Sequence, residues 1–136
     1  MIVVDASVLA TALIDDGTDG ALARARLGGE VLAAPELIDL EVSSVLRRLV
    51  LHGHLPVQRA EQALGDLTAL PLQRAPHLPL LDRCWSLREN VSAYDAAYIA
   101  LAESLGSMLV TADVKLSTAP GLRCVVEVLR RSGASK

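Results

Sequence analysis

The sequence predicts an α/β fold whose central, mainly parallel sheet of about five strands is flanked by helices. Short aliphatic and β-branched runs alternate with longer segments of helical periodicity, which is typical of strands joined by crossover helices. With 136 residues the chain has the length of one domain, predicted over residues 1–131. The last residues, "SGASK" at 132–136, are expected to form a frayed tail.

The predicted strands are short and apolar. The first, Ile2–Val4, reads as a buried strand although it runs directly into an aspartate. Similar runs follow at intervals that leave room for a helix between them, as parallel pairing requires. They lie at Val31–Ala33, Leu70–Gln73, Met108–Thr111 and Leu122–Val126.

The predicted helices begin and end at recognisable signals. Gly28-Gly29, Gly53 and Gly106 each follow an apolar helical stripe, and glycine commonly ends helices. Pro56 stands where proline is tolerated, at the start of a helix. The resulting helices are Ala6–Ile14, Asp19–Leu27, Glu36–His52, Val57–Leu70, Leu78–Arg88 and Tyr94–Leu105.

Composition limits the class of protein. No apolar stretch is long enough to span a bilayer, and the amino terminus lacks the basic segment of a signal peptide, so no membrane association is expected. Cys84 and Cys124 form no motif and predict reduced thiols in a cytoplasmic protein. The net charge of −3 and the 2% aromatic content do not indicate a basic or base-stacking RNA module. The mean hydropathy of +0.38 suggests burial against a partner or a second copy.

Four acidic residues stand where ordinary duties could explain each of them. Asp5 and Asp113 follow strands and could cap helices, and Ser92 with Asp95 resembles a capping box. Glu41 lies within an apolar helical stripe, at whose edge its side chain could reach water.

The combination of these acids favours a shared site. Ligands of open parallel sheets bind outside the carboxyl ends of the strands, where the strand order reverses. If the strands ending near Asp5 and Asp113 are neighbours, these carboxylates converge there, and Glu41 and Asp95 could complete a ring. Crowded carboxylates repel one another, and Mg²⁺ or Mn²⁺ would remove that penalty.

The segments "MIVVDASVLATALI", "ELIDLEVSSVLRR", "SAYDAAYIALAESLG" and "MLVTADVKL" resemble the PIN-domain ribonucleases, and most closely the VapC-type toxins of toxin–antitoxin pairs. The resemblance covers nearly the whole chain and implies a three-layer PIN-like fold. It implies that Asp5, Glu41, Asp95 and Asp113 are catalytic, that Asp5, Asp95 and Asp113 bind the metal, and that Ser7 or Thr111 supplies a hydroxyl nearby.

The resemblance also implies an activity and its partners. The expected reaction is Mg²⁺- or Mn²⁺-dependent cleavage of RNA (tRNA, rRNA or mRNA), leaving 5′-phosphate and 3′-hydroxyl ends. The expected partners are a VapB-like antitoxin and a second copy of the chain, with a larger hetero-oligomer as a further option. "DVKLS", residues 113–117, lacks the additional acid that some relatives carry after the late aspartate.

The remaining polar and aromatic residues admit more than one role. Arg47, Arg48 and Lys115 could bind RNA phosphates or could be ordinary solvated side chains, and Arg24 and Arg26 are expected on a solvated face. His52 and His54 are expected at the surface near a helix end, and Trp85 in the core or a dimer interface.

Two other functions are compatible with the acids. A phosphotransfer domain with an acidic pocket is disfavoured because Ser7 stands where an aspartyl phosphatase needs its second aspartate. A PIN-fold module that binds RNA or protein without cutting it is the main alternative.

Overall fold

The computed structural model describes residues 1–129, and within them five parallel strands form one sheet in the order β3-β2-β1-β4-β5. The strands are β1 (Ile2–Val4), β2 (Leu32–Pro35), β3 (Gln73–Ala75), β4 (Leu109–Thr111) and β5 (Val126–Val128). The predicted parallel sheet of about five strands is confirmed. The predicted tail, residues 132–136, lies outside the described residues.

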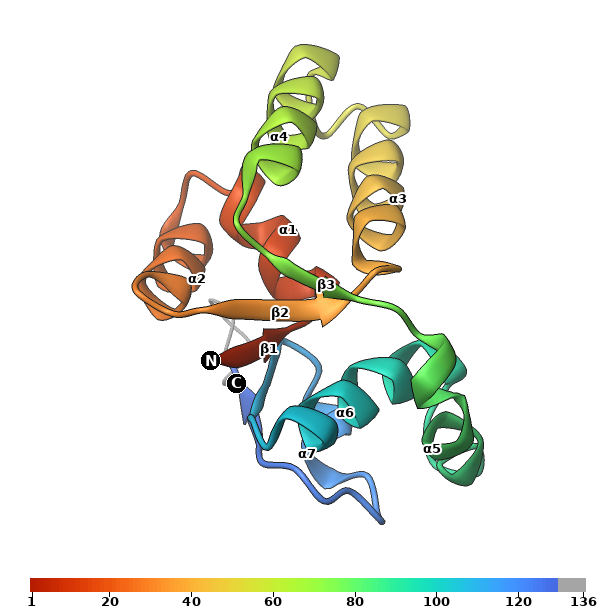
Figure 1. Ribbon diagram of the computed structural model, residues 1–136. Helices are drawn as coiled ribbons and strands as arrows, with labels where there is room; N and C mark the ends of the chain where they lie inside the picture. The colour runs from red at the N-terminus through yellow and green to blue at the C-terminus, as the bar shows by residue number, and fades with distance from the viewer. Residues whose placement is uncertain (130–136) are drawn as a thin grey trace.

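Helices cover both faces of the sheet (Figure 1). One layer contains α1 (Ala6–Ile14), α2 (Thr18–Leu27), α3 (Ile38–Leu51) and α4 (Val57–Ala69). The other contains α5 (Leu81–Ser86), preceded by the 3₁₀ turn η1 (Leu78–Leu80), together with α6 (Ala93–Leu105) and α7 (Val114–Thr118). The predicted three-layer arrangement is therefore present.

The sheet order places the switch in strand order between β1 and β4. From β1 the chain adds β2 and β3 on one side, and it then adds β4 and β5 on the other. Backbone hydrogen bonds fix this pairing, with the N–H of Val3 donating to Met108 O at 2.9 Å and the N–H of Asp5 to Val110 O at 3.2 Å. The carboxyl ends of β1 and β4 are therefore neighbours, as the metal-site hypothesis requires.

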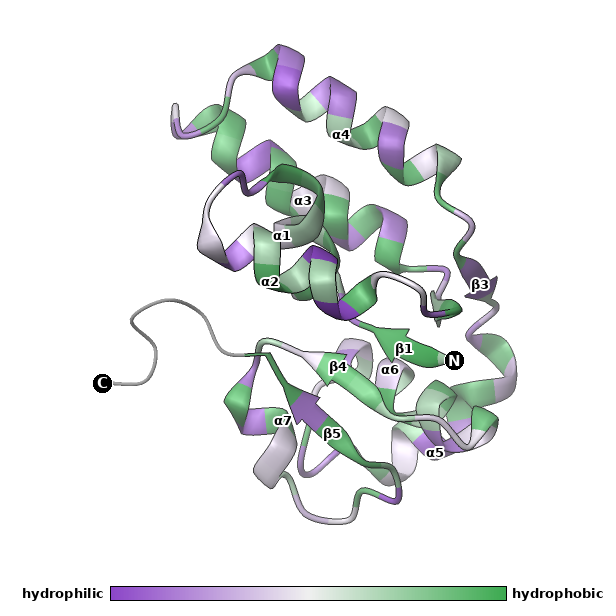
Figure 2. Cartoon of the chain, turned by 90° about the vertical axis from the view of Figure 1, so that its left-hand side faces the viewer, coloured by the Kyte–Doolittle hydropathy of each residue, from purple (hydrophilic) through white to green (hydrophobic). Residues whose placement is uncertain are grey.

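The core lies where β1 and β4 meet the helices. Val3, Val4, Leu109 and Val110 are fully buried, and β1 appears hydrophobic along its length in Figure 2. The most deeply buried helix is α6, which packs beneath β1, β2 and β4 and keeps Ala96 to Ala102 inside. The carboxylate of Asp95, in the first turn of α6, is thus held against an apolar layer.

Local signals set the ends of the two helices that bear on the site. Asp5 caps α1 by accepting a hydrogen bond from the N–H of Val8 at 3.1 Å. Ser92 caps α6, and Gly106 ends it in the left-handed conformation, with φ of 61°. The predicted capping roles of Asp5 and Ser92 are confirmed.

Two edge strands begin later than the sequence predicts. The run Leu70–Gln73 contains Pro71, which has no N–H for the ladder, so β3 starts only at Gln73. The run Leu122–Val126 includes Arg123, whose N–H donates to the Glu103 carboxylate at 2.7 Å. That contact holds Arg123 outside the ladder, which begins with the hydrogen bond from the Leu109 N–H to Val125 O at 2.9 Å, and β5 itself starts at Val126.

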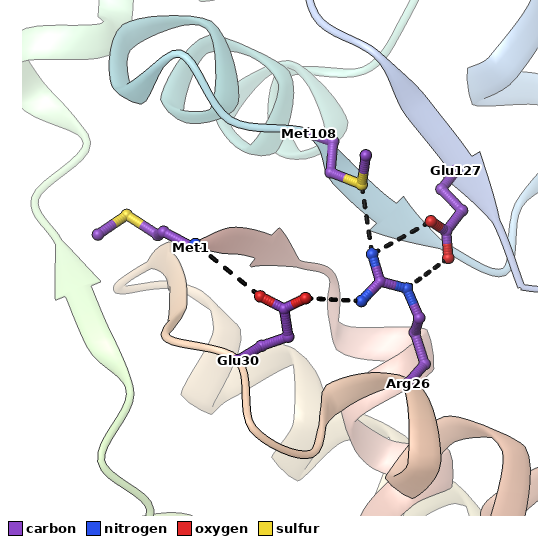
Figure 3. A network of polar contacts seen from close by, with 5 residues as sticks. All are labelled: Met1, Arg26, Glu30, Met108 and Glu127. Atoms are coloured by element: carbon purple, nitrogen blue, oxygen red, sulfur yellow. Dashed lines mark hydrogen bonds and ion pairs between the residues drawn. The ribbon is translucent and has the colours of Figure 1, made fainter.

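The prediction that Arg26 lies on a solvated face is wrong. Its guanidinium is half-buried between α2 and β5, where it binds Glu127 at 2.7 Å and Glu30 at 3.1 Å (Figure 3). Glu30 also lies 3.9 Å from the amino-terminal nitrogen of Met1. This network connects the edge strand β5 to α2, which belongs to the helix layer of α1 to α4.

The core placement of Trp85 is also wrong. Its side chain on α5 is 68% exposed, with the Arg88 guanidinium 4.8 Å from the ring centroid. His52 and His54 are exposed, as predicted. Both cysteines are free, although Cys124 is only half-buried. None of the helices in the described part of the chain is long and apolar enough to cross a membrane.

Candidate active site

Asp5 lies at the carboxyl end of β1 and is 9% exposed. Its Oδ1 accepts hydrogen bonds from Ser7 Oγ at 2.7 Å and from the Val8 N–H at 3.1 Å. Its Oδ2 accepts one from the Thr111 hydroxyl. Burial raises the pKa of this carboxyl more than the donors lower it. Asp5 is therefore a capping residue held firmly in place at a cost in desolvation.

Thr111 and Ser7 join the ends of the two central strands. Thr111, fully buried at the end of β4, donates to Asp5 and accepts the N–H of Asp113 at 3.0 Å. Ser7 donates to the same carboxylate and accepts the N–H of Ala112 at 3.4 Å. Both predicted hydroxyl residues therefore contact Asp5.

Glu41 reaches the site from α3. Its Oε1 accepts a hydrogen bond of 2.6 Å from the hydroxyl of Tyr98 on α6. Burial raises the pKa of Glu41, the Tyr98 hydrogen bond lowers it, and the charges of Asp95 and Asp5 raise it further. The half-buried Glu41 therefore faces other carboxylates. A glutamate at the edge of the stripe with its side chain in water would not do so.

Asp95 and Asp113 complete the acidic group. The N–H of Asp95, in the first turn of α6, donates to Ser92 Oγ at 3.1 Å. Burial raises the pKa of the Asp95 carboxyl, and the charges of Asp113 and Asp5 raise it further. Asp113 caps α7 by accepting from the N–H of Lys115 at 2.9 Å, and its side chain is exposed. Local capping and proximity to other acids therefore coexist in these residues.

All four acids line one cleft of about 580 Å³ at the carboxyl edge of the sheet. Ser7 and Arg48 also line it, whereas Thr111 lies buried behind Asp5. Arg47 and Lys115 are exposed but are not among the lining residues. Of the three predicted RNA-binding cations, only Arg48 is therefore at the cleft itself.

The donor set suits a hard divalent cation. Four carboxylates offer only oxygen ligands. The pKa values of Glu41 and Asp95 are raised first by burial and then by the charges of the neighbouring acids, and a cation would relieve that repulsion. Within residues 1–129, however, no three His, Cys, Asp or Glu side chains stand close enough to hold one ion as they are arranged. The acids would have to draw closer together to share it.

Two features of the cleft escape a reading of the sequence. Tyr98 bonds Glu41, although its position three residues after Asp95 on the same helical face could have suggested a site role. The other feature is the position of Leu40, which is 74% exposed and joins Leu37 and Val45 in an apolar wall along the start of α3. The sequence indicated an apolar stripe around Glu41, but not that an exposed leucine would border the acids.

Comparison with known proteins identifies the fold and the family. The model of the PIN domain family matches residues 2–122. "Ribonuclease VapC9" of Mycobacterium tuberculosis is 43% identical over 131 residues, which cover 96% of this chain and 100% of that relative. The chain belongs to the PIN domain family, among the VapC ribonucleases. "Ribonuclease VapC1" of the same organism is 41% identical over 129 residues, covering 94% of this PIN domain and 97% of the relative.

Solved structures support the PIN fold. A toxin-antitoxin complex from Klebsiella pneumoniae has a chain with a TM-score of 0.66 and 19% identity, covering 96% of this PIN domain and 99% of that chain. VapBC2 from Rickettsia felis, bound to a promoter DNA fragment, gives 0.67 at 13% identity and covers 94% and 98%. The backbone is therefore shared although most residues differ.

Proposed function

We propose that this PIN domain is the endoribonuclease toxin of a toxin–antitoxin pair and that Mg²⁺ or Mn²⁺ supports its reaction. The observation that carries the proposal is the convergence of Asp5, Glu41, Asp95 and Asp113 on one cleft at the switch in strand order. The names of the VapC relatives supply the reaction class, RNA cleavage.

In this proposal Asp5, Asp95 and Asp113 hold the cation. When bound, Mg²⁺ or Mn²⁺ supplies Lewis acidity for the scissile phosphate and for an attacking water. Ser7 and Thr111 keep Asp5 in one orientation through their hydroxyl groups. A rigid carboxylate of this kind needs little reorganisation when substrate arrives.

The other cleft residues orient the reactants. Glu41 binds the cation or orients the attacking water, since its carboxylate lies within the influence of Asp5 and Asp95. Arg48, near the end of α3, binds a phosphate of the RNA, and Arg47 and Lys115 contact the RNA backbone farther from the cleft. In-line attack by water leaves a 5′-phosphate and a 3′-hydroxyl, and the 2′-hydroxyl takes no part.

The proposed partners follow from the surface and from the relatives. Leu37, Leu40 and Val45 give the cleft an apolar wall that suits the insertion of a VapB-like antitoxin. Exposed Leu78, Leu81 and Trp85 provide apolar area for a homodimer, from which a larger assembly with antitoxin could form. The RNA substrate, whether tRNA, rRNA or mRNA, implies that the protein acts in the cytoplasm.

The test is to sequence RNA 5′ ends after induction of the wild-type protein, of Asp5→Ala and of Glu61→Gln. Glu61 is exposed on α4 and does not line the cleft, so Glu61→Gln serves as a matched acidic control. New 5′-phosphate ends are expected with the wild type and the control but not with Asp5→Ala. If Asp5→Ala gives the same ends, or if the wild type gives none, the PIN domain acts as a binding module and the nuclease proposal fails.

A further inference from the structure

Tyr98 links the two helix layers at the acidic cleft. It lies on α6, and Glu41 lies on α3, on opposite sides of the sheet (Figure 1). The Tyr98 hydroxyl donates to Glu41 Oε1 at 2.6 Å, a short distance typical of a hydrogen bond to a carboxylate. The rest of the Tyr98 side chain is core, since the residue is only 2% exposed.

This contact restricts a side chain that would otherwise have considerable freedom. A glutamate side chain has several rotatable bonds, and ordering it costs free energy. The side chain of Tyr98 is held in place because it is buried on the core-facing side of α6, so its hydroxyl offers Glu41 a fixed anchor. Oε1 is committed to that anchor, and Oε2 has no hydrogen-bond partner among residues 1–129.

The acids of the cleft therefore differ in how firmly they are held. Asp5 and Glu41 receive hydroxyl groups from neighbouring segments, namely from Ser7, Thr111 and Tyr98. Asp113 receives only a backbone N–H from the start of its own helix, and its side chain is exposed. Part of the cleft is thus prearranged, and part is free to adjust.

We propose that Tyr98 is a positioning residue that holds the Glu41 carboxylate so that its second oxygen serves the divalent cation, directly or through a water. This inference rests on the proposed function. If Tyr98 were only structural, its hydrogen bond to Glu41 would do no more than satisfy a buried hydroxyl group. A residue that orients a metal ligand affects both metal affinity and catalytic activity, so these two measurements distinguish the roles.

The first test compares Tyr98→Phe, Glu41→Gln and the double variant. Mn²⁺ affinity is measured by electron paramagnetic resonance of free Mn²⁺, without RNA, and kcat and KM are measured with RNA. Tyr98→Phe should weaken Mn²⁺ binding about 10-fold and lower kcat about 10-fold with KM within about twofold. In the Glu41→Gln background the same change should cost less than about twofold, because the positioned carboxylate is already gone.

The matched control is Ser43→Ala. Ser43 is on α3 close to Glu41, but its hydroxyl donates to Asp39 O and it does not line the cleft. Ser43→Ala should leave Mn²⁺ affinity and kcat within about twofold of the wild type. The inference is overturned if Tyr98→Phe lowers only thermal stability, or if its effect adds in full to that of Glu41→Gln.

A second measurement covers the case in which Tyr98→Phe does not fold. The chain has only two tyrosines, so protein labelled with ¹³C at the tyrosine Cζ gives two signals. Titration of the wild type with Mg²⁺ should shift the Tyr98 signal, and Glu41→Gln should abolish that shift. An unmoved Tyr98 signal in a wild type that binds Mn²⁺ overturns the inference alone. A wild type that neither binds Mn²⁺ nor cleaves RNA overturns the proposed function and the inference with it.

Discussion

Neutralising Glu41 should stabilise the metal-free fold while removing activity. In Glu41→Gln the amide oxygen can still accept the Tyr98 hydrogen bond, so the change removes charge and little else. Burial and the charges of Asp95 and Asp5 outweigh the Tyr98 hydrogen bond, because the pKa of Glu41 is raised. The ionised form is therefore less stable in the folded protein than in the unfolded chain.

Solvent screening limits the expected gain. Because Glu41 is only half-buried, the gain in the free energy of unfolding at pH 7 should be about 1 kcal/mol at most, the usual size of a solvent-screened charge interaction. For a chain of this length that gain raises Tm by about 3 °C. A raised pKa destabilises the fold only above the value in the unfolded chain, about 4.3, so the difference between variant and wild type should disappear below that pH.

The assay is thermal and urea unfolding in EDTA between pH 4 and 8, with Glu61→Gln as the control. The same substitution at exposed Glu61 should change the free energy of unfolding by less than about 0.5 kcal/mol. With excess Mg²⁺ the wild type should gain stability by mass action, and Glu41→Gln should gain less. A variant that is less stable than the wild type at pH 7, or whose advantage grows as the pH falls, would refute the reasoning.

Three further predictions concern the scaffold. Arg83→Met removes a guanidinium that holds Glu103 on α6 at 2.6 Å and should lower the free energy of unfolding by about 2 kcal/mol in urea; an unchanged urea midpoint would contradict this. Burial raises the pKa of Glu103, but the bonds from Arg83 and the Arg123 N–H lower it more. The ionised Glu103 should therefore stabilise the fold fully above a pH of about 4.3, and this effect should be lost as the pH falls through the lowered pKa. Tm measurements over the same pH range should show no such loss for Glu103→Gln. Ile99→Ala, at a fully buried position of α6, should cost about 3 kcal/mol, and a loss below about 1 kcal/mol would indicate that the core closes around the gap.

The local signals of the sequence were sufficient for the elements next to the site. The predicted helix Ala6–Ile14 has the bounds of α1, because Asp5 caps it within the same few residues. The predicted helix Tyr94–Leu105, observed as α6, ends at Gly106 for an equally local reason, because glycine readily adopts the left-handed conformation found there. The predicted edge strands, by contrast, were displaced by Pro71 and by the contact of Arg123 with Glu103.

The four acids could be selected from the sequence because strand ends and helix stripes limit where they can lie. Their convergence was a hypothesis that depended on β1 and β4 being neighbours, and the sheet order bears out that condition. The partner of Glu41 could not be selected in this way, since Tyr98 lies 57 residues farther along the chain.

The sequence by itself thus determined the succession of strands and helices, the caps and the acidic residues that face the cleft. Only the tertiary structure decided which hydroxyl holds which carboxylate, and that Arg26 turns inward to Glu127, 101 residues away. The physical reason is range. Capping and helix termination depend on atoms within about four residues, whereas contacts between layers depend on how the whole sheet is covered.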